Sequence, residues 1–488
     1  MIVAVGFLVA ALYGASALRL LRIRLSHWEF IALAPGIGAG LITLATFVAL
    51  AWGVPFALTS ALIAILALPL ILWWLRLAQQ LEKVAHQPNA EAPTNSLGNL
   101  ARPPRFQVDA LLVRRRFQDD LFQMPMALTG LDIPLVVLIL LLVGYAFLLA
   151  LYWPPYAWDA LAIWVVKAKA IFATGSLAGS VYGAYPFYPL HIPLQMSLLL
   201  NRLPISAIQI IFPIYFALLL LSFGGTLRRF CSRSYSLVFV LLLAATPTLV
   251  YQSTVAMADV PFTYYYVSSV LYLFLYLSGQ GKGFALLSGM LVGIAAWTRP
   301  EGLLYFAINL AVLAVHLLRH RRGFADTILY LLMFGVFWLP WTFYSNLQDW
   351  QSGLVGPAVA AIKEIATLKV QWDKVGAVLA YFESQWTNLR ESGAAWILFG
   401  VSLLNLRAMR QNIYLLAVIL LNVVGLLFTY YAVPTDGLSL DWWLRTGFIR
   451  MATHFMPLLL FYAAILLQPV LTYFPRVVLS HEAIRYSP

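Results

Sequence analysis

Apolar runs of about twenty residues recur along almost the whole chain, and they constrain its fold more than any other feature. Each run is long enough to cross the hydrocarbon core of a bilayer as a helix. The runs do not alternate apolar and polar residues, as the strands of a membrane β-barrel do. Only 10% of the residues are charged, far below the roughly 25% usual in soluble domains. The sequence therefore predicts an all-α polytopic membrane protein.

We expect about 13 transmembrane helices, since about that many runs reach the length of a span. The expected spans are residues 2–20, 28–51, 54–76, 132–153, 205–227, 235–255, 261–279, 283–298, 301–318, 324–345, 392–407, 412–431 and 449–473. They predict a three-span N-terminal unit (1–76), a polar linker (77–131), a transmembrane core (132–473) and a tail (474–488). Two further amphipathic regions are expected on one face, in the loop 154–204 and at about 346–391. The second could lie on the membrane surface as a cover, or serve only as a connector.

The net charge of +12 could indicate nucleic-acid binding, so its distribution decides what it means. Most lysines and arginines fall in alternate loops, among them "RLLRIR", "VRRRF", "RRFCSR" and "RHRR". Such an excess on one side is typical of cytoplasmic loops. It places the N-terminus outside and the C-terminus inside, and it speaks against a nucleic-acid partner. The single cysteine, Cys231, excludes a disulfide framework and a thiolate metal cluster.

On this topology, four charged clusters that are far apart in the sequence lie at the outer face. The first is "WDALAIWVVKAKAIF" with the later "YPFYPLHIPLQ", and the second is "STVAMADVPFTYYY". The third is "AAWTRPEGLLYF" and the fourth is "RTGFIRMATHFMPLLLF". The middles of the spans carry almost no charge, which argues against a proton relay or a voltage sensor.

The two aspartates of these clusters have two compatible interpretations. Asp159 and Asp259 each precede or begin an expected helix, where an aspartate often serves as an N-cap. A carboxylate can also act as general base toward an acceptor hydroxyl or amine. Cations at the same level can hold and neutralise a phosphate leaving group. Acids and cations together on a wet face therefore suit group transfer from a phosphate-bearing lipid.

The cations of the clusters are less specific, because a Lys or Arg near a span end is usually an interfacial anchor. Arg299 and Glu301 are two residues apart, and we do not expect them to face each other on a helix. Arg450 and His454 are one turn apart and are expected to share a helix face.

Together, these motifs resemble the C-type superfamily of integral-membrane glycosyltransferases, over residues 132–473. Within it, the sequence is most similar to bacterial protein O-mannosyltransferases and lipid A aminoarabinose transferases, which use polyprenyl-phosphate-linked sugars. The motifs that carry the resemblance are "WDALAIWVVKAKAIF", "YPFYPLHIPLQ", "MADVPFTYYY", "TRPEGLL" and "RMATHFMP", in this order. The resemblance implies an enzyme of a bacterial-type cytoplasmic membrane, acting at the outer face.

The resemblance also implies roles for individual residues. Asp159 would be the catalytic base, and Asp259 would orient the acceptor or share the base role. The remaining expected site residues are donor-phosphate ligands (Lys167, Arg299, Arg450, His454) and substrate-lining residues (Trp158, Tyr185, Tyr188, His191, Glu301). The reaction would be an inverting single displacement from a polyprenyl-phosphate sugar to a lipid, glycan or protein acceptor. Protein mannosyltransferases carry a paired Asp-Glu where this chain has Asp159 and Ala160, which weakens the case for a protein acceptor.

No cofactor is expected, although a divalent metal is possible. Asp159, Asp259, Glu301 and His191 offer suitable ligand atoms, but their spacing matches no metal motif. Two other functions stay open. A flippase or transporter of a lipid-linked sugar often shows internal repeats and broken helices near the midplane; neither is evident here, although Pro247 and Pro340 leave broken helices open. An O-antigen-type ligase or polymerase would place arginines in a large outer loop, and residues 346–391 contain only Arg390.

Overall fold

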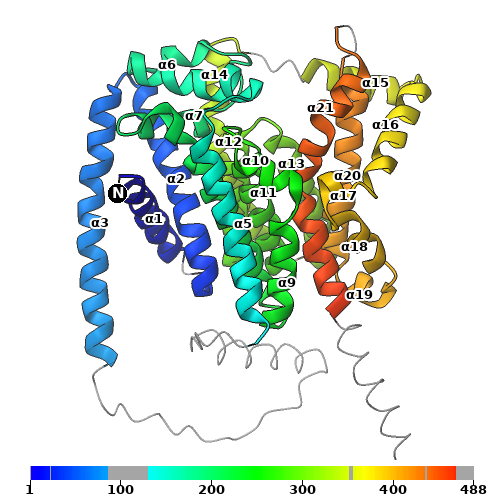
Figure 1. The fold of residues 1–488 in the computed structure, drawn as a ribbon, viewed down its shortest axis with the longest axis horizontal. Coiled ribbons are helices and arrows are strands. Elements are labelled where there is room, and N and C mark those ends of the chain that lie inside the picture. The colour runs from blue at the N-terminus through cyan, green and yellow to red at the C-terminus, as the bar shows by residue number, and fades with distance from the viewer. Residues whose placement is uncertain are drawn as a thin grey trace, which may run out of the picture.

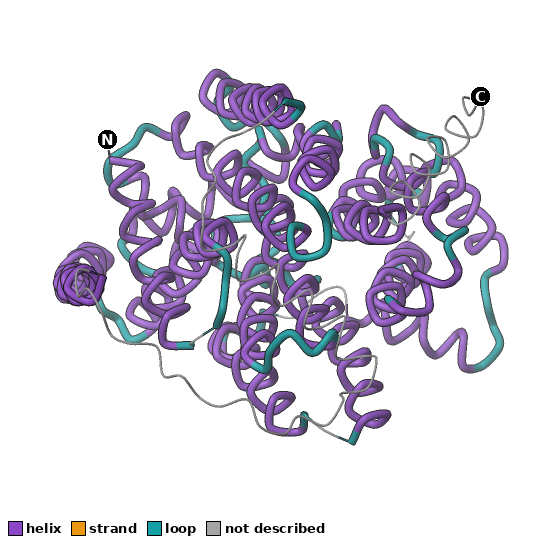
Figure 2. The backbone as a smooth tube through the Cα atoms, turned by 90° about the horizontal axis from the view of Figure 1, so that it is seen from below, coloured by secondary structure: helices purple, strands orange, loops and turns teal. Residues whose placement is uncertain are grey.

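A computed structural model describes residues 2–21, 23–85, 130–321, 323–350, 355–434 and 437–468. Within these ranges the chain forms helices and loops and no β-strand, as Figures 1 and 2 show from two directions. The all-α prediction is therefore confirmed. The helices are α1 (Ile2–Leu20), α2 (His27–Ala51), α3 (Phe56–Ala85), α5 (Asp132–Tyr152), η1 (Ala160–Val165), α6 (Val166–Thr174), η2 (Leu177–Val181), α7 (His191–Leu200), η3 (Ile205–Ile210), α8 (Ile211–Leu227), α9 (Arg233–Ala244), α10 (Pro247–Ser253), α11 (Asp259–Leu277), α12 (Gly283–Thr298), α13 (Gly302–His320), α14 (Phe324–Leu347), α15 (Val355–Ala366), α16 (Trp372–Gln385), α17 (Leu389–Ser392), α18 (Ala395–Ser402), α19 (Leu406–Gln411), α20 (Ile413–Ala432) and α21 (Leu440–Thr453), followed by Met456–Gln468.

The length and apolar composition of these helices make the chain an integral membrane protein. Eight helices of the described residues are long and apolar enough to cross a bilayer, or up to ten if each bent pair counts as one span. The expectation of about 13 spans is not confirmed. Two of the expected spans, α12 and most of α1, are shorter apolar helices, and the run 392–407 divides into α18 and α19. Asn405 separates this last pair, because its side chain accepts the amide of Ala408 and starts a new helix.

Two spans are bent sharply, and one bend shapes the candidate site. Helices α9 and α10 meet at 68°, with Pro247 at the first turn of α10. Proline favours the start of a helix, because its missing N–H would be unpaired there in any case. Helix α21 and Met456–Gln468 meet at 47°. His454 lies directly at this bend, as the C-cap of α21.

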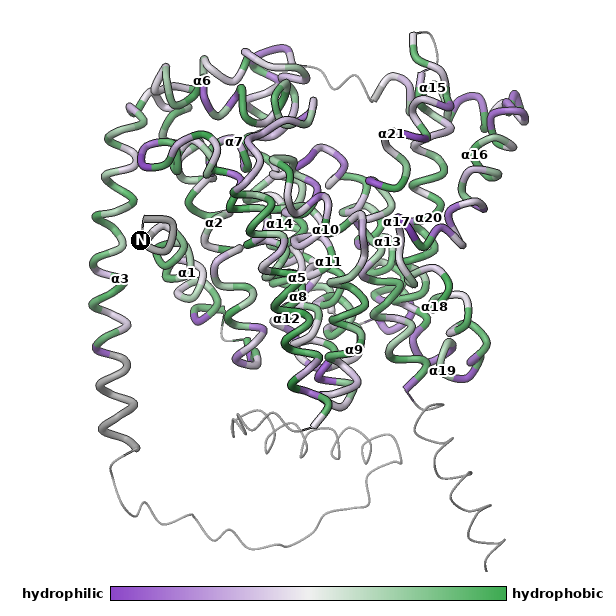
Figure 3. Tube along the Cα trace, viewed as in Figure 1, coloured by the Kyte–Doolittle hydropathy of each residue, from purple (hydrophilic) through white to green (hydrophobic). Residues whose placement is uncertain are grey.

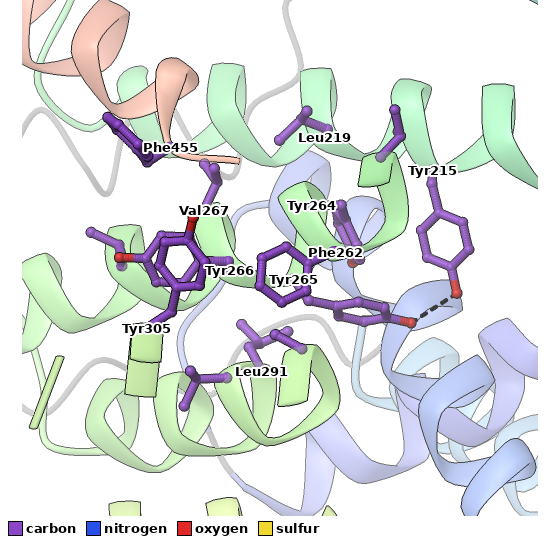
Figure 4. Packing of buried hydrophobic residues seen from close by; sticks show 14 of the residues in the cluster. Tyr215, Leu219, Phe262, Tyr264, Tyr265, Tyr266, Val267, Leu291, Tyr305 and Phe455 are labelled. Carbon is purple, nitrogen blue, oxygen red and sulfur yellow. Dashed lines mark hydrogen bonds between the residues drawn. The ribbon is translucent and has the colours of Figure 1, made fainter. Parts of the chain in front are cut away.

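Helix α11 forms the centre of the molecule, and its residues from Asp259 to Tyr276 are buried. It packs against α8 and α12, and its tyrosine rings fill the space between the surrounding helices (Figure 4). Its hydroxyls bond to other helices: Ser268 to Ser222 on α8, and Tyr266 to Asn422 on α20. In a bilayer, where lipid is as apolar as the side chains, such bonds contribute to helix association.

Helix α2 belongs to this centre, although it precedes the polar linker in sequence. It packs on α8, and the hydroxyls of Tyr264 and Tyr265 donate to the carbonyls of Ala32 and Gly36 on α2. Helix α1 lies against α2 so closely that a Cβ on Gly38 would overlap α1 backbone. Helix α3, in contrast, stands at the edge of the bundle and exposes a row of leucines and isoleucines (Figure 1). It continues to Ala85, into the expected linker; the remainder of that linker and the tail 474–488 lie outside the described residues.

The two predicted non-spanning regions are helical. Helices η1, α6 and α7 occupy the loop 154–204, and α15 and α16 occupy most of 346–391. Helices α6, α15 and α16 lie at the same end of the bundle (Figure 1), and polar residues are frequent on α16 (Figure 3). Val359, Ile362 and Ile365 form an exposed apolar stripe on α15. This confirms the amphipathic character of that helix, while its role as a cover stays a prediction.

Candidate active site

Six charged or titratable side chains from four separate segments meet at the ends of helices. They form what we call the acid–arginine network: Asp159 before η1, Asp259 at the start of α11, Arg299 and Glu301 between α12 and α13, and Arg450 and His454 at the end of α21. The sequence analysis singled out all six. Their assembly follows from the chain reversals, because each residue lies at or beside a helix end.

Asp259 is the buried centre of this network. Its Oδ1 lies 2.6 Å from Nη1 of Arg299, 3.2 Å from Nε2 of His454 and 3.5 Å from Nε of Arg450. The side chains of Asp259, Arg299 and His454 are between 0 and 3% exposed. Its other oxygen, Oδ2, is buried without a hydrogen-bond partner in the described structure. A carboxylate this deeply buried is stable only because guanidinium groups surround it.

Arg299 connects Asp259 to a second acid. Its Nη2 and Nε bind the two oxygens of Glu301 at 2.7 and 3.2 Å. The expectation that Arg299 and Glu301 do not face each other was wrong. Arg299 has extended backbone angles (φ −147°, ψ 147°) as the C-cap of α12, so helical spacing does not apply across this break. Burial alone would raise the pKa of Glu301, but the charge and hydrogen bonds of Arg299 outweigh it, so the pKa lies below its usual value.

Asp159 and Arg450 form the accessible end of the network. Nη1 of Arg450 lies 2.6 Å from Oδ2 of Asp159, and their side chains are 27 and 22% exposed. Asp159 makes no capping hydrogen bond to η1, and the N-cap of α11 is Ala258 rather than Asp259. The capping interpretation of both aspartates therefore gives way to an ion-pair role. Arg450 and His454 both contact Asp259, which confirms that they share a face of α21.

The balance of charge in the network limits how it can bind an anion. It contains three carboxylates and two guanidiniums, with one imidazole. Arg299 is engaged by two acids and is almost fully buried, so it has little capacity left for a phosphate. Arg450 is the better candidate, because it is partly exposed and its closest partner, Asp159, is also partly exposed.

Lys167 lies apart from these ion pairs. Its side chain is buried, and its Nζ donates to the backbone carbonyl of Tyr185 at 2.6 Å. Burial lowers the pKa of Lys167 to about 7. The rings of Tyr185 and Tyr188 stack with centroids 5.3 Å apart, and Trp158 is exposed. The loop after α6 thus presents aromatic surface, as the sequence indicated.

His191 has different neighbours. It is fully buried, and its nitrogens bond to Thr43 on α2 at 2.6 Å and to Tyr215 on α8 at 3.2 Å. Tyr265 on α11 lies 3.3 Å away and also bonds to Tyr215, as drawn in Figure 4. These contacts link α2, α7, α8 and α11 and give His191 a packing role. We therefore leave it out of the site proposed below.

Two aromatic residues missed from the sequence enclose His454. The rings of Phe262 and Tyr305 lie 4.7 and 6.1 Å from its imidazole. Helical spacing could have found them, because Phe262 lies one turn after Asp259 and Tyr305 one turn after Glu301. They limit the access of water to the buried half of the network.

Three of the carboxylates that could bind a metal ion each face a guanidinium group. Among the described residues, no group of three or more His, Cys, Asp or Glu side chains could hold a metal ion. Asp159, Asp259 and Glu301 each face an arginine at 2.6–2.7 Å. A divalent cation bound at the arginine-facing oxygens of these three carboxylates would have to displace the guanidinium groups.

A recess of about 710 Å³ lies at the N-terminal end of α21, the end opposite to Arg450. It is lined by Val370, Gln371, Trp372, Asp373, Lys374, Ala377 and Leu440. Leu440 begins α21, so about 15 Å of helix separates it from Arg450. The recess is too far from the network to be part of the same group of contacts.

Comparisons with known proteins are few. No protein-family model and no curated protein matches the chain. Among solved structures, the chain is similar to the crystal structure of ArnT from Cupriavidus metallidurans bound to undecaprenyl phosphate, at 14% sequence identity and a TM-score of 0.47. The match covers 68% of this chain and 60% of that one. A similarity of this size establishes neither a family nor a function.

Proposed function

We propose that the protein is a membrane glycosyltransferase that moves a monosaccharide from a polyprenyl-phosphate donor to an acceptor. The observation that carries the proposal is the arrangement of the acid–arginine network. Its side chains are mostly buried, and the most exposed part is one carboxylate–guanidinium pair, Asp159 and Arg450. Such a pair offers both groups that the reaction requires: a base for the acceptor and a cation for the leaving phosphate.

In this mechanism, donor binding changes the partner of Arg450. The donor phosphate approaches Arg450 and competes with Asp159 for its guanidinium. Guanidinium groups bind phosphate and carboxylate oxygens with the same planar geometry, so the exchange needs little rearrangement. Asp159, no longer paired, is then free to accept a hydrogen bond from the acceptor. The carboxylate thereby becomes available as a base only when a donor is present.

The chemical step is a single displacement with inversion. An acceptor hydroxyl or amine attacks the anomeric carbon, and Asp159 accepts its proton. The bond between that carbon and the phosphate oxygen breaks, and its electron pair stays with the polyprenyl phosphate. Arg450 neutralises the charge that develops on this oxygen. No covalent intermediate with the protein is required.

The buried residues of the network support this step by keeping Arg450 oriented. Asp259 lies 3.5 Å from Nε of Arg450, as an ion pair without a hydrogen bond, while Arg299 and His454 bind Asp259. A site supported in this manner keeps the guanidinium oriented when its outer partner changes. Arg299 and His454 therefore act on the phosphate through Asp259 and Arg450. Asp159 immediately precedes η1 and α6, so the proposed reaction takes place at the end of the bundle that carries α6, and we propose that this end faces the outside of a cytoplasmic membrane.

The test uses the full chain in lipid nanodiscs with a panel of polyprenyl-phosphate monosaccharides. Release and transfer of sugar are measured for wild type, Asp159→Asn and Arg450→Lys. Asp441→Asn is the matched control, because Asp441 also pairs with an arginine of α21, but both side chains are largely exposed. We expect turnover to fall about 10²–10⁴-fold in Asp159→Asn, the range of a lost general base, and to stay unchanged in the control.

Two results would contradict the proposal. Unchanged turnover in Asp159→Asn would remove its base role. Donor binding without transfer to any acceptor, combined with movement of the donor between leaflets, would favour a transporter of lipid-linked sugars.

A further inference from the structure

Tyr185 has a backbone conformation that a tyrosine rarely adopts. Its φ is +56°, in the left-handed region that is an outlier for bulky side chains. It precedes Pro186, which further restricts the backbone angles open to it. Such a conformation persists only where the surroundings determine it. The neighbouring contacts show how this is achieved.

The carbonyl of Tyr185 accepts two hydrogen bonds. One comes from the amide of Tyr188 at 3.0 Å and the other from Nζ of Lys167 at 2.6 Å. The residue before it, Ala184, is tied to η1 by a bond of 2.8 Å from its amide to the carbonyl of Ala162. The loop backbone also lies directly on the lysine side chain, since a Cβ on Gly183 would be 3.2 Å from Cγ of Lys167. Lys167 thus packs against the loop backbone and donates a hydrogen bond to it.

The loop held in this way carries the stacked pair Tyr185 and Tyr188. The Tyr185 ring is 40% exposed, and Tyr188 packs on Trp164 with centroids 5.6 Å apart. Burial raises the pKa of the Tyr188 hydroxyl, and the charges of Glu301, Arg299, Arg450 and Asp159 also act on it, so the hydroxyl lies within electrostatic range of the network. An exposed aromatic face next to a reacting centre suits the apolar face of a sugar ring.

We propose that Lys167 is a positioning residue that holds Tyr185 in its left-handed conformation and so fixes the Tyr185–Tyr188 pair as the wall for the donor sugar. This role differs from the phosphate-ligand role expected from the sequence. Lys167 is buried, and its Nζ already binds a backbone carbonyl, which favours a positioning role. The proposal rests on the proposed glycosyltransferase function only for the identity of the ligand.

The structural half of the proposal can be tested without any substrate. Hydrogen exchange of residues 182–190 is followed in the full chain for wild type, Lys167→Met and Lys169→Met. Lys169 is the matched control, because it lies on the same helix and is exposed. We expect exchange in this segment to rise at least tenfold in Lys167→Met and to stay unchanged in Lys169→Met. Unchanged exchange in Lys167→Met would overturn the proposal.

The functional half is tested by a double-mutant cycle with Tyr185→Gly. Glycine adopts positive φ without cost from a side chain, so this background needs no lysine to hold the backbone. We expect Lys167→Met to raise KM for the donor about tenfold in wild type, and less than threefold in Tyr185→Gly. Inhibition by polyprenyl phosphate, which carries no sugar, should change less than twofold. Equal losses in both backgrounds, or weaker inhibition by polyprenyl phosphate, would make Lys167 a phosphate ligand instead.

Two outcomes separate this inference from the proposed function. If wild type transfers no sugar from any donor, the glycosyltransferase proposal fails, while the exchange experiment still decides whether Lys167 holds the loop. If Lys167→Met does not fold, recovery of folded protein in Lys167→Met/Tyr185→Gly supports the proposal. Continued failure to fold in this pair overturns it.

Discussion

Substitution of Asp259 is expected to lower mainly stability, whereas substitution of Asp159 is expected to lower mainly catalytic turnover. Asp259 is 1% exposed and faces Arg299 at 2.6 Å, whereas Asp159 is 22% exposed and faces Arg450 at the same distance. Removing one partner of a buried ion pair leaves an uncompensated charge and costs about 3–5 kcal/mol. Exposed pairs contribute only about 0–1 kcal/mol. The burial of the two carboxylates therefore predicts opposite phenotypes for the same chemical change.

We expect Asp259→Asn to lower the free energy of unfolding by about 3 kcal/mol, the lower end of the buried range. The loss is limited because each arginine retains one acidic partner, Glu301 for Arg299 and Asp159 for Arg450. Asp159→Asn should lower it by at most about 1 kcal/mol, yet lose turnover. Unfolding in mixed detergent–SDS micelles measures the first quantity, and sugar transfer measures the second. Equal destabilisation by both substitutions would refute the assignment of Asp259 as the buried support and Asp159 as the accessible base.

Three further results are expected. Arg229→Gln should lower the free energy of unfolding by about 3–5 kcal/mol and leave donor binding unchanged, because it strands the buried Glu29; donor titration of the folded variant checks the second part. Since burial lowers the pKa of Lys167 to about 7, the folded chain holds fewer protons than the unfolded chain above that pH. The free energy of unfolding of wild type, relative to Lys167→Met, should therefore rise between pH 7 and the ordinary pKa of lysine near 10.4, as unfolding at stepped pH would measure. Transfer activity should survive EDTA, because arginines occupy the acids of the network, and a loss restored by Mn²⁺ would contradict this.

The membrane class and the members of the network could be predicted because both depend on simple patterns. Hydropathy identifies apolar helices, since a bilayer leaves few other ways to satisfy the backbone. The distribution of arginine and lysine assigned four distant clusters to one face, and six residues from these clusters do meet. Topology supplies this information even when the tertiary fold is unknown.

The pairing within the network could not be predicted in the same way. Arg299 reaches Glu301 because the chain leaves helical geometry at Arg299, and helical periodicity does not predict that break. His191 was expected to line the substrate site because of the family resemblance, but it bonds to Thr43 on α2. That contact spans 148 residues and depends on packing between distant helices. The spacing of residues along the chain therefore does not predict the contact between His191 and Thr43.

The ion pair between Glu29 and Arg229 has a consequence for the synthesis of the protein. The two residues are 200 positions apart, and both guanidinium–carboxylate contacts are 2.7 Å. At about 5–20 residues per second, α2 waits about 10–40 s after its own synthesis before its partner is made. During this interval Glu29 has its local capping contact to Ser26 but lacks its guanidinium partner, and α2 lacks the tyrosine hydroxyls of α11. The packing of α2 is therefore completed only after the middle of the chain has been synthesised. Nascent chains that stop before Arg229 are expected to be targets for membrane quality control.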